Sequence, residues 1–197
     1  MDGTMDSVLN ILDEDENDLD FVFVKNLLRY VLLECYPNAK WQPNGVFAKD
    51  SIASPFSLVV KSAVKMFLKS RKEEIRDDFE LDFPSKDSIS NRSFLEYLLC
   101  SKIDFERKPF YNASFLEFLC RCSEYTVISY WYGISLAPQM TLQIICIMMR
   151  EMRESGKITE NLWKDFEEFC EIYVQDEKRK IELGKPKRSW KKIFCAI

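Results

Sequence analysis

The side chains that could carry out chemistry in this chain are carboxylates, lysines and cysteines, because the 197 residues include no histidine. Without histidine, the Ser–His and Cys–His dyads, histidine-ligated zinc and imidazole acid–base catalysis are all excluded. The five glycines are not clustered, so the sequence has no glycine-rich loop of the kind that cradles phosphate. An enzyme would have to work with carboxylates or lysines alone. We therefore expect a binding protein that is not an enzyme and needs no cofactor or metal.

The cysteines and the overall charge limit the setting and the partners. Seven cysteines are scattered, mostly inside apolar helical patterns, at positions 35, 100, 120, 122, 146, 170 and 195. This distribution is typical of buried free thiols in a reducing compartment, not of a disulfide framework. No positively charged start is followed by an apolar run, so we expect no signal peptide. The net charge of −4 offers no general attraction to nucleic acid.

The stretch 112–137 predicts the helix around which the rest of the chain is organised. Asn112 can cap its start, and Pro138 is expected to close its far end. Its only charges, Glu117, Arg121 and Glu124, are spaced i, i+4, i+7 and should share one face. Beyond Glu124 the apolar residues go all the way round. The run is too short to span a bilayer, so we expect a central core helix.

The other apolar patterns predict amphipathic helices that wrap this central one. Apolar residues at helical spacing run through 19–35, 55–83, 140–155 and 162–173, and a short helix is expected at 94–99 after a turn at 88–92. No stretch alternates with period two for long enough to predict a strand. The sequence therefore predicts an all-α, single-domain bundle of seven to eight helices.

The expected domain organisation follows the charge pattern along the chain. Residues 1–18 are acidic and are expected to be a flexible N-terminus, and residues 19–183 to be the helical domain. Residues 184–197 are expected to be a basic tail that ends in an apolar stub. Basic residues of this tail could attract anionic lipid, although a solvated basic tail is the commoner outcome.

Three short motifs, in order and at suitable spacing, resemble those of the Bcl-2 family. Leu68-Lys-Ser-Arg-Lys-Glu-Glu-Ile75 has the shape of the family's third homology motif, with a lysine at the glycine position and a glutamate at the aspartate position. Asn112-Ala-Ser-Phe115 stands where the first motif, Asn-Trp-Gly-Arg, begins the central helix. Asn161-Leu-Trp-Lys-Asp-Phe166 resembles the second motif, Gly-Gly-Trp-x-x-Phe. The chain looks like a divergent member, similar to viral or invertebrate relatives, with a Bcl-2-like bundle.

The resemblance implies helix-in-groove recognition, in which a partner's amphipathic helix lays apolar anchors into a cleft. The cleft would lie between the helix at 55–83, the short helix after it and the start of the central helix. By resemblance its lining would be Leu68, Ile75, Phe79, Phe83, Leu95, Leu98, Leu99, Asn112, Phe115 and Leu119. Each of these residues is also consistent with plain core packing. The implied function is regulation of apoptosis, in the pro-survival direction, by sequestering death-motif helices of pro-apoptotic family members.

Phe115 departs from the family pattern. It stands where the family has the arginine that pairs with a ligand aspartate, and phenylalanine cannot make that charge-assisted contact. Three alternatives stay open: a nearby cation (Arg92, Lys102, Arg107 or Lys108) substitutes, the ligand range is narrow, or the groove does not bind death-motif helices. The last alternative describes an adaptor, as in poxviruses, that keeps the fold and inhibits innate immune signalling through other surfaces.

The tail bears on localisation. Residues 188–197 resemble the approach to the family's C-terminal membrane anchor, and the anchor itself is absent from the sequence, either lost or truncated. We expect a cytoplasmic protein, with membrane association through the tail at the mitochondrial outer membrane or another intracellular membrane left open. A homodimer is likewise left open. The sequence does not indicate whether the protein restrains or promotes death, because both arms of the family would share the fold.

Overall fold

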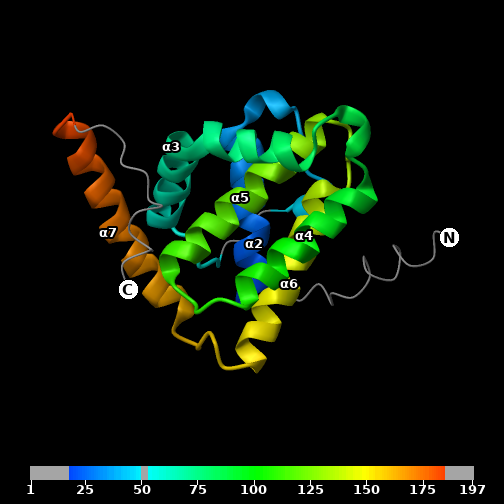
Figure 1. Cartoon of the computed structure of the whole chain (residues 1–197). Coiled ribbons are helices and arrows are strands. Elements are labelled where there is room, and N and C mark those ends of the chain that lie inside the picture. The colour runs from blue at the N-terminus through cyan, green and yellow to red at the C-terminus, as the bar shows by residue number, and fades with distance from the viewer. Residues whose placement is uncertain (1–17, 50–52, 185–197) are drawn as a thin grey trace.

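The computed structural model describes residues 18–49 and 53–184, and over these residues it is helical with no strand. The prediction of an all-α fold is confirmed. Figure 1 shows the six α-helices, which are α2 (Leu19–Tyr30), α3 (Leu58–Asp82), α4 (Asn91–Glu106), α5 (Asn112–Trp131), α6 (Ala137–Glu154) and α7 (Leu162–Glu182). Four single turns complete the described secondary structure: a π-helical turn (Val31–Cys35) and three 3₁₀ turns (Pro37–Ala39, Gly45–Phe47 and Lys86–Ser88).

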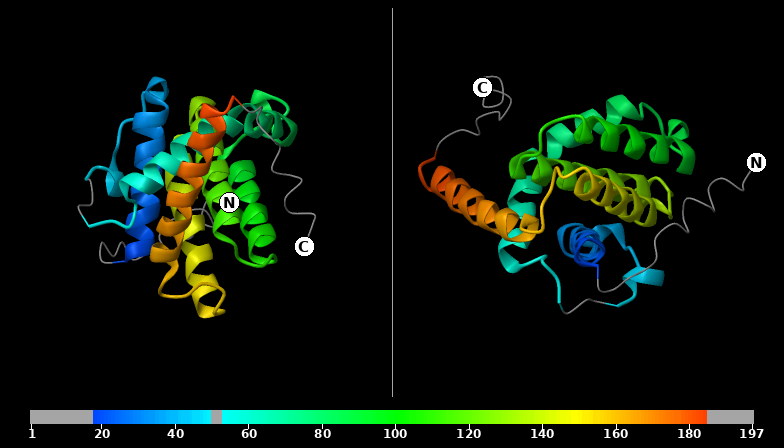
Figure 2. Two further views of the ribbon diagram at one scale, coloured as in Figure 1. Left: turned by 90° about the vertical axis from the view of Figure 1, so that its left-hand side faces the viewer. Right: turned by 90° about the horizontal axis from the view of Figure 1, so that it is seen from below.

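Helix α5 lies at the centre of the bundle (Figures 1 and 2). It packs against α3, α4, α6 and α7, while α2 packs on α6 and α7 packs along α3. Of its 20 residues 13 are buried, including Glu124 and three further polar residues. The apolar residues that go all the way round this helix explain why it can be covered on most sides.

The central helix ends earlier than the sequence predicts. We expected it to reach residue 137 and to be closed by Pro138, but α5 ends at Trp131. Gly133 lies two residues after the end of α5 and adopts a left-handed conformation with φ of 96°. This conformation is typical of the residue that terminates a helix. Pro138 instead lies in the first turn of α6, where its missing N–H costs nothing.

The number of helices and the bounds of the helix before α5 also differ from the prediction. We predicted a turn at 88–92 and a short helix at 94–99, whereas α4 runs over 16 residues. Its start is fixed by a capping box in which Ser90 and Ser93 exchange backbone and side-chain hydrogen bonds. The described residues hold six α-helices, so the expected seven to eight are not confirmed.

The first described helix is clasped to the far end of the chain. Asp20 accepts hydrogen bonds from Arg153 at the end of α6, with Nε at 2.6 Å and Nη2 at 2.7 Å. The same carboxylate accepts a 3.1 Å hydrogen bond from the indole of Trp163 in α7. Next to this clasp the ring of Phe23 stacks on Trp163 with centroids 4.1 Å apart. These contacts join α2, α6 and α7 into one core.

Four of the six described cysteines are buried and all six are free, in agreement with the expectation of buried thiols; Cys100 is exposed and Cys35 is half-buried. Within the described ranges no helix combines the length and the apolar character that crossing a membrane requires. The acidic residues 1–17 and the basic tail 185–197, on which the lipid and anchor predictions depend, lie outside the described residues.

Candidate functional site

The side chains predicted to line a groove are mostly part of the core. Seven of them have exposed fractions of 8% or less: Leu68, Ile75, Phe79, Phe83, Leu98, Phe115 and Leu119. Leu95 and Asn112 are partly covered, and Leu99 is 39% exposed. In this structure a ligand would not touch the buried seven, so the groove lined by these side chains stays a prediction.

The buried aromatic residues of α3 and α4 contact one another over α5. The ring of Phe79 lies 5.0 Å from those of Phe83 and Tyr125, and the ring of Tyr97 in α4 stacks on Tyr125 at 4.3 Å. Phe83 also meets Tyr97 at 6.0 Å. This cluster closes the space between the C-terminal half of α3 and the N-terminal half of α4.

Phe115, which stands at the family's arginine position, is a core residue. It is 1% exposed, and its ring contacts Phe166 in α7 at 5.1 Å and Phe110 at 5.5 Å. Beside it, the Asn112 amide donates to the carbonyl of Asp165 at 3.2 Å. The first turn of α5 therefore packs against α7.

The four basic residues proposed to replace the family arginine do not lie together beside Phe115. Arg92 is 85% exposed and pairs with Glu96 one turn along α4. Lys102 is turned toward α6, where it pairs with Glu151 as well as with Glu106. Arg107 and Lys108 are exposed at the end of α4.

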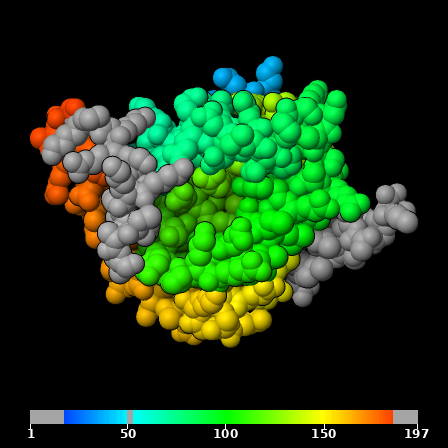
Figure 3. All heavy atoms as spheres, viewed as in Figure 1, coloured from blue at the N-terminus to red at the C-terminus, as the bar shows by residue number. Residues whose placement is uncertain are grey.

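A hollow nevertheless lies on this face of the molecule. Figure 3 shows it between α3 and α4, with α5 as its recessed floor. Four of the partly exposed positions of α5, Ala113, Ser114, Glu117 and Arg121, fall within one 100° arc of the helix. We call the space between α3 and α4 the hollow. These positions on its floor hold charged and small side chains and no large apolar ones.

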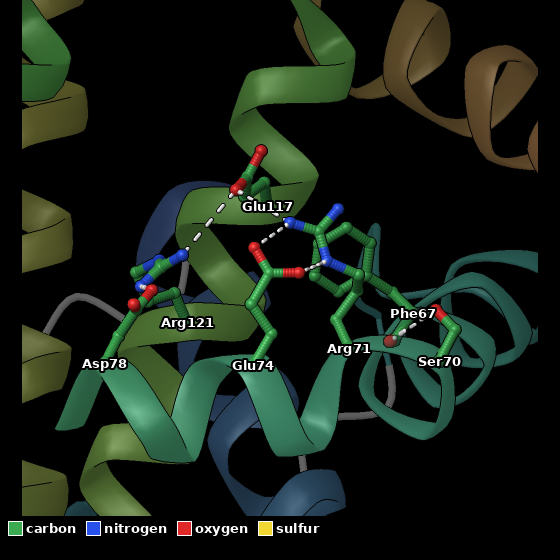
Figure 4. Close-up of polar contacts among 7 residues, drawn as sticks. All are labelled: Phe67, Ser70, Arg71, Glu74, Asp78, Glu117 and Arg121. Carbon is green, nitrogen blue, oxygen red and sulfur yellow. Dashed lines mark hydrogen bonds and ion pairs between the residues drawn. The ribbon is translucent and has the colours of Figure 1, made fainter. Parts of the chain in front are cut away.

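Five charged side chains from α3 and α5 interlock along one side of the hollow, and we call them the charged row (Figure 4). Arg71 of α3 pairs with Glu74, with Nε 2.7 Å and Nη2 2.8 Å from its two carboxylate oxygens. Arg121 of α5 reaches Asp78 of α3 at 2.6 Å. Glu117 lies between the two arginines, 3.8 Å from a guanidinium nitrogen of each.

The charged row continues toward the aromatic cluster. The Tyr125 hydroxyl donates to Asp82 at 2.8 Å, and Tyr97 lies near Arg121. Burial by itself would lower the pKa of Arg121, but the hydrogen bond and charge of Asp78, with smaller contributions from Tyr97 and Tyr125, raise it above its ordinary value. Arg121 is therefore a permanent cation that already has a carboxylate partner.

The third charged residue of α5, Glu124, also faces α3, but it is buried. Its carboxylate has no exposed surface and is held by Arg76, whose Nε lies 2.9 Å away. The guanidinium of Arg76 in turn lies over the rings of Trp131 and Tyr36. The i, i+4, i+7 spacing correctly predicted that Glu117, Arg121 and Glu124 share a face, and the structure shows that this face is turned to α3.

A small cavity opens beside the charged row, at the junction of α3, α5 and α7. Its volume is about 20 Å³, enough for about one water molecule or a methyl group. It is lined mainly by apolar side chains, with the two charged residues Arg71 and Glu117 at its edge, and the lining is Phe67, Arg71, Ala113, Leu116, Glu117, Phe169 and Tyr173. The ring of Phe67 meets Tyr173 at 6.5 Å, which joins α3 to α7 here.

In α3 the charges that line the hollow, at 71, 74 and 78, belong to a charge-rich helix face. Such a face is usually solvated, so the sequence alone does not mark it as part of a site. Among the described residues no group of histidines, cysteines and carboxylates is arranged to hold a metal ion.

Comparisons with protein-family models, with curated proteins and with solved structures give no match for this chain.

Proposed function

We propose that the protein regulates apoptosis by binding an amphipathic helix of a partner in the hollow between α3 and α4. The observation that carries the proposal is the hollow itself, floored by α5 and flanked by two amphipathic helices (Figure 3). Grooves between helices are a recurring site for amphipathic partner helices. The three motif resemblances, at 68–75, 112–115 and 161–166, add that the partners are death-motif helices of pro-apoptotic family members and that the effect is pro-survival.

The position of the motifs in the fold supports this proposal. The 68–75 motif lies on α3, the 112–115 motif begins α5 and the 161–166 motif spans the start of α7, in the chain order expected of the family. A ligand in the hollow would contact the partly exposed face of α5 without unfolding the core. The buried aromatic cluster would enter the contact only if α3 and α4 separated.

A titration of the full chain against a panel of death-motif peptides tests the proposal. At least one peptide is expected to bind with a Kd below about 1 μM, which corresponds to about 8 kcal/mol. Ala113 lies on the floor of the hollow, so Ala113→Trp is expected to fill it and to weaken binding at least tenfold. Glu80→Trp, on the exposed face of α3, is the matched control and should leave the affinity unchanged. A full panel without a binder would refute the proposal.

A second candidate is a fold-sharing adaptor that inhibits innate immune signalling without using the groove. It is favoured by the burial of seven of the ten predicted groove residues, which leaves no open apolar groove at those side chains. Reporter assays in cells separate the two candidates. The adaptor predicts that inhibition of an inflammatory reporter survives Ala113→Trp, whereas the apoptosis regulator predicts that protection from death is lost in the same variant.

A further inference from the structure

The charges along the hollow are unbalanced. Three carboxylates line its α3 and α5 sides, at Glu74, Asp78 and Glu117, against the two guanidinium groups of Arg71 and Arg121. On α4 the side chains that contact α5 across from them, Tyr97 and Phe105, are uncharged. The lining of the hollow is therefore negative overall, although it contains two arginines.

Both arginines are already committed to partners within the chain. Arg121 pairs with Asp78 at 2.6 Å, and Arg71 makes a two-point contact with Glu74. A ligand carboxylate could reach Arg121 only by displacing Asp78. It would also have to approach Glu117, and like charges brought together in this way disfavour binding. The internal pairs thus act against an acidic ligand residue.

Among the carboxylates of the charged row, Glu117 has the longest contacts, so it is the one best able to accept hydrogen bonds from a ligand. Its two ion-pair contacts, to Arg71 and Arg121, are both 3.8 Å long, which is beyond hydrogen-bonding distance. Its side chain is 37% exposed and stands between the α3 side and the floor (Figure 4). A carboxylate in this setting offers two oxygens to a ligand cation.

The small cavity supplies a second, independent feature at the same residue. Glu117 lies on its edge, while its interior is apolar, with Phe67, Leu116 and Phe169 among the lining. A short apolar side chain could enter the cavity while a neighbouring basic side chain reaches Glu117. A helix that carries both within one turn has the required spacing, because residues three and four apart share a face.

We propose that the occupant of the hollow is an amphipathic helix that brings an arginine or lysine to Glu117 and a small apolar side chain to the adjacent cavity. This inference rests on the proposed function, because it specifies the ligand of the same hollow. It reverses the charge expected from the family resemblance, in which the groove supplies the arginine and the ligand the aspartate. The reversal follows from Asp78 and Glu117, which occupy the neighbourhood of the one exposed guanidinium on α5.

A display library tests the charge preference directly. Amphipathic helices of about 20 residues would carry fixed apolar anchors on one face, with the flanking positions randomised among Lys, Arg, Asp, Glu and Gln. They would be selected against the full chain. Selected helices are expected to be enriched in Lys or Arg at a flanking position and to bind more weakly as salt increases. Their affinity is expected to fall about tenfold in Glu117→Gln, the loss of one charge-assisted contact.

One further variant and one stability measurement make the result specific. Glu73→Gln removes the same charge from the exposed face of α3 and should change the affinity less than twofold. Glu117→Gln itself should keep the thermal stability of the parent protein, because within the described residues the contacts of the Glu117 carboxylate are two partly exposed ion pairs of 3.8 Å, which contribute little. A loss of affinity with unchanged stability therefore reports on the ligand contact.

The other outcomes separate the inference from the proposed function. Selected helices enriched in Asp or Glu, whose binding falls in Arg121→Gln but not in Glu117→Gln, would overturn the inference and leave helix binding intact. Basic helices that bind Glu117→Gln as well as the parent would also overturn it. A library that yields no binder to the parent chain, with a death-motif panel that yields none either, would remove the proposed function along with the inference.

Discussion

Arg76 Nε lies 2.9 Å from Glu124 Oε1, and this contact fixes a carboxylate with no exposed surface in the middle of the central helix. The arginine is 29% exposed and lies over the rings of Trp131 and Tyr36. Burial raises the pKa of the Tyr36 hydroxyl, and the nearby Glu124 carboxylate raises it further. The pair therefore joins α3, α5 and the turn after α2 at one buried charge.

Removing one partner of this pair should be costly. Arg76→Ala leaves Glu124 buried without its counter-charge, and we expect the free energy of unfolding to fall by about 2–3 kcal/mol. Urea denaturation at pH 7 measures the change. The double variant with Arg76→Met and Glu124→Leu should recover most of the loss, because apolar replacement of a buried pair is often neutral. If Arg76→Ala has no more effect than Arg92→Ala, at an exposed pair, the contact contributes nothing to stability.

The Asp20 clasp gives a second stability prediction. Asp20→Ala removes the acceptor of Nε and Nη2 of Arg153 and of the Trp163 indole, which are donors of partly buried residues, while Nη1 of Arg153 keeps its hydrogen bond to the Thr159 carbonyl. We expect a loss of about 2–4 kcal/mol, visible as a lower Tm in thermal unfolding followed by circular dichroism. Asp176→Ala is the comparison, since its pair with Arg179 lies on the surface of α7 and should be worth under about 1 kcal/mol. Equal effects of the two variants would contradict the prediction.

Gly133 should resist replacement for reasons of backbone conformation alone. Its φ of 96° is unfavourable for any residue with a Cβ, while the space around an added Cβ is open. Gly133→Ala is therefore expected to cost about 1 kcal/mol without any steric clash. Chemical denaturation measures it, with Ser135→Ala in the same turn as the control. A neutral Gly133→Ala would mean that the turn between α5 and α6 can adopt another conformation.

The buried thiols predict a loss of stability in mild alkali. Burial raises the pKa of Cys122 and of Cys170 to about 12 from an ordinary value of about 9. Around pH 9 the unfolded chain therefore releases protons that the folded chain retains. The contribution of each thiol to the free energy of unfolding is fully present below this pH. It falls as the pH rises above it, by up to about 1.4 kcal/mol per pH unit for each thiol.

Urea midpoints between pH 8 and 9.5 test the thiol prediction below the range in which tyrosines ionise. Cys122→Ala should reduce the dependence of stability on pH, whatever its effect on stability at pH 7. Cys100→Ala should leave the pH dependence unchanged, because this cysteine is exposed. A stability that does not change between pH 8 and 9.5 would show that the thiols titrate alike in both states.

The sequence predicted the central helix well because its signal is local. The i, i+4, i+7 charges and the continuous apolar run lie within one element, so helical geometry alone places Glu117, Arg121 and Glu124 on one face. Its end was predicted less well, since a proline at 138 fits a helix start as well as a stop. The left-handed Gly133 decides between the two; a glycine just past the last helical residue is a common helix stop, but the prediction relied on Pro138 instead.

The site was harder to predict because it depends on which faces meet. Arg71 and Asp78 belong to a charge-rich helix face that looks solvated in isolation, and only packing against α5 turns them into partners of Glu117 and Arg121. Phe115 shows the same dependence on packing from the other side. Its place in a motif suggested a ligand contact, whereas its aromatic neighbours in α7 make it core.

The clasp between Asp20 and the α6–α7 end has a consequence for the order in which the protein can fold. Its contacts join residues 133 and 143 positions apart in the chain. Phe23 meets Phe56 edge-on earlier in the chain, but its stacked partner is Trp163. During synthesis the first helix must wait until nearly the whole chain has emerged, so the nascent protein carries an uncovered apolar α2 for most of its translation. Because this part of the core forms late, we expect chaperones to bind residues 19–30 early in synthesis.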